Sequence, residues 1–240
     1  MSDRISAWIR WPGYTAWFFL AVLALSVMMV RSGNWQQGLM MYALAGLLSL
    51  VVLLFMAVQS LMPRWGGQRM TILKRALPAL PGAALLLMAM QAGDVPPIHD
   101  ISTDLQDPPV FEKILSLRGD TSNPLELTEE VMEQQLAAYP DLQTLKSPRS
   151  YASSYNAALT TARDLGWEVV REDPNAGFIE AVDTTAIMNF KDDVVIRVRT
   201  NSDGSLIDLR SVSRVGVSDL GANADRIRRF MAAFKAATEV

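Results

Sequence analysis

Residues 190–230 read FKDDVVIRVRTNSDGSLIDLRSVSRVGVSDLGANADRIRRF, and this stretch decides the fold. Two runs of alternating apolar and polar residues, 194–200 and 205–215, flank the turn-forming residues 201–204, which is typical of a β-hairpin. A four-residue loop pairs Thr200 with Ser205 and gives the hairpin one apolar face, made by Val194, Ile196, Val198, Ile207 and Leu209. The other face is charged and carries Arg197, Arg199, Asp208 and Arg210. Apolar residues at helical spacing follow from Ala222, so we expect a final helix that covers the apolar face.

The residues before this hairpin predict a second hairpin and two helices. Alternating runs at 167–171 and 178–183 flank a turn that contains Pro174 and Gly177. Helical patterns cover 128–138 and 148–165. We therefore predict an α+β domain at residues 128–240, a two-layer sandwich of a four-stranded antiparallel sheet with helices on one face. Residues 94–127 contain two Pro-Pro pairs and no sustained periodicity, so we expect an extended tether.

Three uncharged apolar segments, 11–30, 39–62 and 76–93, occupy the N-terminal part of the chain. Each is close to the roughly 20 residues that cross a bilayer as a helix. A cleaved signal peptide is the alternative for the first segment, but two further apolar runs follow it. We predict an α-helical membrane anchor at residues 1–93, with three transmembrane helices and with membrane lipids as partners of residues 11–93.

Basic residues in the loops between these segments predict the orientation. Arg4 and Arg10 precede the first segment, Arg31 stands alone in the first loop, and the second loop carries Arg64, Arg69, Lys74 and Arg75. Positive charge favours the cytoplasmic side, so the N-terminus and the second loop are expected there. An odd number of spans then places residues 94–240 on the far side, in the periplasm of a bacterial inner-membrane protein.

The charge distribution excludes some classes of function. Residues 1–93 carry seven Lys/Arg and one acid, whereas residues 94–240 carry fifteen bases and twenty-four acids. An acidic domain lacks the positive charge that nucleic-acid binding requires, so no nucleic-acid partner is expected. The chain has no cysteine, and its acidic residues fit no calcium-loop spacing. We therefore expect no metal site and no cofactor.

Four segments of the chain resemble those of the family known as domain of unknown function 1499. They read IHDISTDLQDPPVF at 98–111, AYPDLQTL at 138–145, FKDDVVIRV at 190–198 and RSVSRVGVSDLGANADRIRRF at 210–230. The resemblance covers about residues 98–238, and the last segment is its most specific part. The family occurs in bacteria and in organisms that bear plastids, often with membrane segments. It implies no biochemical activity, so the function must be inferred from the residues.

The first candidate site lies on the charged strand face and in the loop after it. Guanidinium groups, hydroxyls and an amide next to a helix start can donate hydrogen bonds to an anion. The residues of this expected ligand site are Arg197, Arg199, Arg210, Ser211, Ser213, Arg214 and Asn223. The alternative is structural, with Asp219 as the cap of the last helix and Arg214 paired with Asp192 or Asp193. The favoured function is that of a membrane-anchored envelope protein whose periplasmic-side domain acts as a non-catalytic binding module for an anionic ligand, a lipid headgroup or a protein partner.

The alternative function is a membrane-anchored hydrolase. Its candidate catalytic residues are His99, the only histidine, with Asp192 or Asp219. Adjacent strand residues point to opposite faces, so Asp192 and Asp193 do not form an acid/base pair by spacing alone. If His99 and one of these carboxylates share a pocket, the hydrolase is favoured. If the carboxylates form ion pairs with arginines, the binding module is favoured.

Overall fold

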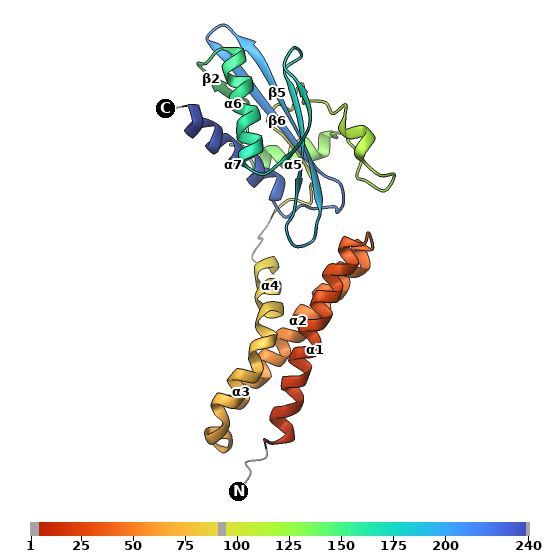
Figure 1. Ribbon diagram of the computed structural model, residues 1–240, viewed down its shortest axis with the longest axis vertical. Coiled ribbons are helices and arrows are strands. Elements are labelled where there is room, and N and C mark those ends of the chain that lie inside the picture. Colours follow the sequence, from red (N-terminus) through yellow and green to blue (C-terminus); the bar gives the residue numbers. More distant parts are fainter. Residues whose placement is uncertain (1–4, 91–94, 239–240) are drawn as a thin grey trace. The chain divides into compact units, whose positions relative to one another are not determined.

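The computed structural model describes residues 5–90 and 95–238. It divides into two compact units, residues 1–93 with 187–189 and residues 94–186 with 190–240 (Figure 1). We call them the N-terminal unit and the C-terminal unit. Some of the predictions fall on residues outside this description. They are Arg4 in the prediction of orientation, the end of the predicted third span at 91–93, the start of the predicted tether at Asp94, and residues 239–240 of the predicted domain.

The N-terminal unit is helical. Three of its described segments are long and apolar enough to cross a membrane, namely Ala7–Arg31, Trp35–Leu61 and Pro63–Leu87. The first two are α1 and α2. The third is built from the 3-10 turn η1 (Pro63–Gln68), α3 (Arg69–Ala76), the 3-10 turn η2 (Leu77–Ala79) and α4 (Leu80–Met90). A 25-residue helix is about 38 Å long, which exceeds the roughly 30 Å of bilayer hydrocarbon.

Small residues let α2 and α4 approach each other closely. A Cβ atom on Gly82 would lie 2.6 Å from the Oγ of Ser49, and one on Gly46 would lie 3.2 Å from the carbonyl oxygen of Gly82. Close backbone approach at glycine and serine is how helices pack where lipid removes the hydrophobic driving force.

The C-terminal unit contains a six-stranded antiparallel sheet (Figure 1). Its strands are β1 (Asp100–Ser102), β2 (Leu145–Ser147), β3 (Glu168–Asp173), β4 (Phe178–Thr184), β5 (Lys191–Asn201) and β6 (Gly204–Ser213). The order is β1-β6-β5-β4-β3, and β2 also pairs with β6. The predicted pairing of Thr200 with Ser205 is confirmed.

The prediction of four strands was wrong, because β1 and β2 are missing from it. Each has three residues, which is too short for an alternating pattern. Both form by pairing with β6, where Asp100 lies opposite Val212 and Leu145 lies opposite Ile207. Short segments that have no strand pattern of their own thus become strands by pairing with the long strand β6.

Helices α6 (Tyr151–Asp164) and α7 (Ala222–Thr238) pack against one face of this sheet, here called the helix face (Figure 1). Helix α5 (Glu129–Ala138) is capped by the hydroxyl of Thr128, and its Gln135 side chain bonds the backbone of Ser102 at the edge strand β1. The main core lies between the helix face and α6 and α7, where Trp167, Phe230 and Phe234 stack in series.

The opposite face of the sheet is covered by residues 104–125, here called the strap. The strap follows β1 and contains the 3-10 turn η3 (Ile114–Leu117). A small apolar cluster lies beneath it, formed by Phe111 and Ile114 of the strap with Val182, Val195 and Val212 of the sheet. The buried carboxylate of Glu180 accepts backbone N–H groups of Glu112, Lys113 and Ile114 at 2.9–3.1 Å. The segment predicted as an extended tether therefore contributes a strand and covers a face of the sheet.

Candidate functional site

Arg197 and Arg199 lie under the strap, and carboxylates surround them. The Nη1 of Arg197 lies 2.9 Å from Asp107, and its Nη2 lies 3.1 Å from Asp104. The Nη2 of Arg199 lies 2.7 Å from the fully buried Asp208 and 3.0 Å from Asp104. Burial acts to raise the pKa of Asp104, but the N–H groups of the strap and the two guanidinium groups hold it below the ordinary value. These two arginines attach the strap to the sheet.

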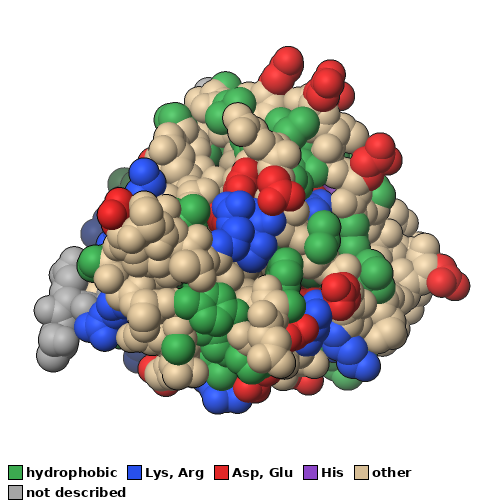
Figure 2. Space-filling view, turned by 90° about the horizontal axis from the view of Figure 1, so that it is seen from above, with side chains coloured by type: hydrophobic (Ala, Val, Ile, Leu, Met, Phe, Trp, Pro, Cys, Tyr) green, Lys and Arg blue, Asp and Glu red, His purple; other side chains and the backbone are tan. Residues whose placement is uncertain are grey.

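Arg210 and Arg214 are also paired. Arg210 forms a two-point pair with the buried Asp100, with distances of 3.0 and 2.7 Å, and donates to the carbonyl oxygen of Leu125 at 2.6 Å. Arg214 forms a two-point pair with the fully buried Asp193, whose carboxylate also accepts from Arg118 of the strap. An anion that binds these guanidinium groups must displace carboxylates already in bidentate geometry. On the face shown in Figure 2, a group of basic side chains near the centre lies next to acidic ones.

Ser211 and Ser213 both bond to the side chain of Asn223. The Ser211 hydroxyl donates to the Asn223 side-chain oxygen at 2.7 Å. The Asn223 amide donates to the Ser213 hydroxyl and to the backbone carbonyl of His99, both at 3.0 Å. All three side chains are buried. They therefore join the end of β6 to the first turn of α7.

Each of the three catalytic candidates has contacts that serve the fold. The backbone carbonyl of His99 accepts from the N–H of Ser213 and from the side-chain amide of Asn223. Asp192 pairs with the buried Arg226, which also contacts Asp183 at 2.7 Å. Asp219 accepts the N–H groups of Gly221 and Asn223 at 2.8 and 2.7 Å, as expected for the cap of α7. Burial raises the pKa of the Asp219 carboxyl, and the charge of Asp192 adds to this effect. Across residues 5–90 and 95–238, no group of three His, Cys, Asp or Glu is arranged to hold a metal.

A groove of about 600 Å³ lies beside the first turns of α7 and was not predicted. Its lining includes Thr184, Thr185, Arg228 and Arg229. Arg228 pairs with Asp141 at 2.7 Å and with Asp225 at 3.2 Å. Arg229 has no ion-pair partner among the residues that the structure describes. The sequence signal was the run Arg226-Ile227-Arg228-Arg229, which places three cations near a helix start. With most of its charges paired, the groove offers one uncompensated guanidinium group.

The loop between β6 and α7 exposes two large apolar side chains, and sequence reasoning missed them as well. Val217 is 77% exposed and Leu220 is 58% exposed. Leu220 has a φ of 54°, an unfavourable conformation for a branched side chain, and it lies between the Asp219 cap and Gly221. The N–H of Asp219 donates to the carbonyl of Ile98 at 3.2 Å. The loop is therefore held against the residues with which the C-terminal unit begins.

Comparison with known proteins identifies the family. Residues 100–234 match the family described as protein of unknown function DUF1499, and the chain belongs to this family. The resemblance predicted for residues 98–238 is thereby confirmed. No curated protein matches the chain.

Proposed function

We propose that this family member is a membrane-anchored, non-catalytic binding module of the bacterial envelope, and that its β6–α7 loop contacts the bilayer surface. The observation that carries the proposal is the exposure of Val217 and Leu220 on a loop bonded to the first residues of the C-terminal unit. Exposed apolar side chains on an ordered loop mark an interaction surface.

The short covalent link between α4 and the C-terminal unit favours the bilayer as the partner of the loop. Helix α4 ends at Met90 and the described part of the C-terminal unit begins at Val95. Five residue steps reach at most about 18 Å. If α4 ends at the membrane surface, Val95 stays within that reach, and the eight residue steps to Ile98, to which the loop is bonded, reach at most about 29 Å. The nearest apolar phase available to Val217 is then the boundary between headgroups and acyl chains.

A weak contact is sufficient in this arrangement. Burying the two side chains completely is worth roughly 3–6 kcal/mol, and the interface gives only part of that. Because the loop is already tethered, its effective concentration at the surface is high, and modest contact energy still orients the unit. The strained φ of Leu220 costs on the order of 1 kcal/mol. A strained leucine at an exposed position supports a role in contact and not in folding.

The basic residues support one orientation for the anchor. Arg64, Arg69, Lys74 and Arg75 all lie in η1 and α3, before the apolar part of the third helix. Under the positive-inside rule this end faces the cytoplasm. The N-terminus is then cytoplasmic, residues 94–240 are periplasmic, and the β6–α7 loop faces the outer leaflet of an inner membrane.

The absence of native cysteine allows a direct test with a single label. The full chain carrying Val217→Cys, labelled with a fluorophore, is reconstituted in nanodiscs that contain nitroxide-headgroup lipids. The control is Asp203→Cys in the β5–β6 turn, because the ten residues of β6 separate the two ends by about 30 Å. We expect strong quenching at position 217 and little at position 203. Equal quenching at the two positions, with equal access for aqueous iodide, would refute the proposal and favour a protein partner.

A further inference from the structure

Pro12 interrupts the hydrogen-bond ladder of α1, and a side chain of α2 repairs it. Proline has no N–H, so the carbonyl of Trp8 loses its normal partner four residues later. The Gln59 amide nitrogen donates to this carbonyl at 3.0 Å. Because a carbonyl only accepts, this bond fixes which end of the Gln59 amide is the nitrogen. The Oε1 of Gln59 must therefore find its own donor elsewhere.

That donor is missing among the described residues. Gln59 is 3% exposed, and its Oε1 is buried without a hydrogen-bond partner. The indole Nε1 of Trp65 is also buried without a partner. Both side chains line the same small cavity, which has a volume of about 110 Å³ and is here called the polar cavity. One orphaned acceptor and one orphaned donor at a single cavity are costly unless a further group satisfies both.

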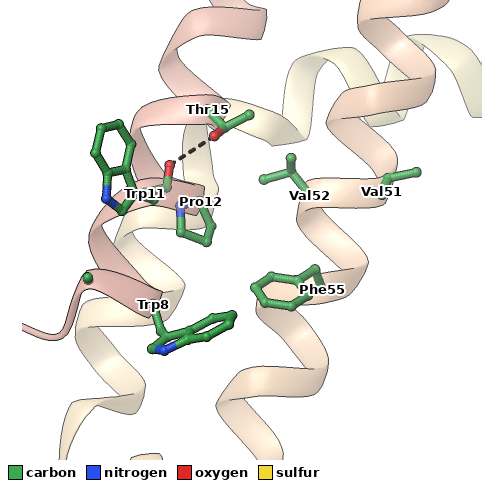
Figure 3. Close-up of a pocket in the computed structure, with 8 residues that line it drawn as sticks. Trp8, Trp11, Pro12, Thr15, Val51, Val52 and Phe55 are labelled. Carbon is green, nitrogen blue, oxygen red and sulfur yellow. Dashed lines mark hydrogen bonds between the residues drawn. The ribbon is translucent and has the colours of Figure 1, made fainter.

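The polar cavity adjoins a larger apolar groove between α1 and α2. This groove has a volume of about 490 Å³, and Trp8 and Phe55 line both spaces. Figure 3 shows the rings of Trp8 and Phe55 facing each other between the two helices, with Pro12 and Val52 further along the groove. At the polar cavity, the guanidinium group of Arg64 stacks over the Trp65 ring at 4.7 Å. The two spaces thus combine an apolar channel, a donor–acceptor pair and a cation.

We propose that the N-terminal unit binds one glycerophospholipid whose anionic headgroup carries a free hydroxyl. An acyl chain lies in the apolar groove. The hydroxyl donates to Gln59 Oε1 and accepts from Trp65 Nε1–H, because a hydroxyl can do both. Arg64 neutralises the phosphate. The terminal ammonium group of an ethanolamine headgroup can only donate, and the trimethylammonium group of choline can do neither. The inference requires the helices to lie in a bilayer but does not depend on the β6–α7 loop.

The test measures lipid retained by the purified full chain in native mass spectrometry. Detergent-solubilised protein is offered equimolar phosphatidylglycerol, phosphatidylethanolamine and phosphatidylcholine. We expect one retained phosphatidylglycerol, preferred about tenfold, as one or two further hydrogen bonds of the hydroxyl would give. Trp65→Phe removes only the N–H donor and should abolish most of the preference. Val51→Phe fills the groove and should lower retention of all three lipids.

Trp35→Phe, at the start of α2, is the matched control and should behave as the wild type. The proposal fails if the wild type retains the three lipids equally. It also fails if Trp65→Phe keeps the same preference as Trp35→Phe, in which case water satisfies the two buried groups. Neither outcome bears on the quenching measured at position 217, so the two proposals fail separately.

Discussion

The helix face and the strap face of one sheet are held by different chemistry. On the helix face, α6 and α7 bury a continuous apolar core that includes Trp167, Phe230 and Phe234. On the strap face, a smaller apolar cluster shares the space with arginine–carboxylate pairs, among them the fully buried Asp193 and Asp208. The helix face also has the buried pair Arg226–Asp192, but it derives most of its stability from area removed from water. The strap face depends on every charge having its partner, because a buried pair is worth little net energy but a broken one is costly.

This contrast gives the largest predicted effect. Asp193→Asn keeps the shape of the side chain but leaves Arg118 and Arg214 without their carboxylate. We expect a loss of about 3–5 kcal/mol in the free energy of unfolding, measured by denaturant titration of the full chain in detergent. Asp203→Asn, in the exposed β5–β6 turn, is the control and should change little. A loss below about 1 kcal/mol for Asp193→Asn would mean that the pairs do not hold the strap.

A single substitution on the helix face should cost less stability than Asp193→Asn costs on the strap face. Phe230→Leu keeps an apolar side chain between Trp167 and Phe234, and only part of the ring contact is lost. We expect a loss of about 1–2 kcal/mol in the same titration. If Phe230→Leu proved more costly than Asp193→Asn, the ranking of the two faces would be reversed.

Acid should loosen the strap face selectively. The pKa of Asp104 is below its ordinary value, so near and below about pH 4 the unfolded state binds this proton more readily than the folded state. The Asp104 carboxylate therefore adds to the free energy of unfolding at pH values above its pKa in the unfolded state. This contribution is lost as the pH falls through its pKa in the folded state. Asp104→Asn removes this group, so the gap in stability between wild type and variant should narrow from pH 6 to pH 3. A constant gap would show that Asp104 is not ionically coupled to Arg197 and Arg199.

The smallest effect concerns the β6–α7 loop. Leu220→Gly relieves the positive φ, and after the entropy cost of glycine we expect a gain of ~0.5 kcal/mol in stability. The same change should weaken nitroxide quenching at position 217, because one of the two contact side chains is removed. A variant that loses stability would show that Leu220 packs within the fold instead of serving an external contact.

The sequence was informative where structure is local. The register of β5 and β6 and their apolar face follow from alternation and from one turn, and the observed pairing of Thr200 with Ser205 agrees with them. The three apolar helices follow from hydropathy and length. Strands β1 and β2 do not, because each exists only through its pairing with β6.

The arrangement of the charged face was the harder problem. Arg197 and Arg210 stand in a strand, whereas their partners Asp107 and Asp100 stand about a hundred positions earlier in a segment without periodicity. No local pattern links such residues, so a row of paired arginines looks like a row of available ones. The expectation that Arg197, Arg199, Arg210 and Arg214 bind an anion stays a prediction. An anion that binds these arginines would have to displace the carboxylates already paired with them.

One measurement addresses most directly whether carboxylates already occupy these arginines. The unfolding temperature of the full chain in nanodiscs is followed during titration with inorganic phosphate, against chloride at matched ionic strength. Arg199→Gln serves as the comparison, because Arg199 is the most exposed of the four, at 37% of its side chain. We expect only the gradual, non-saturable rise in unfolding temperature that phosphate gives folded proteins in general, equal in wild type and Arg199→Gln. A saturable rise in phosphate that disappears in Arg199→Gln would contradict this account and would make the strap face a binding site.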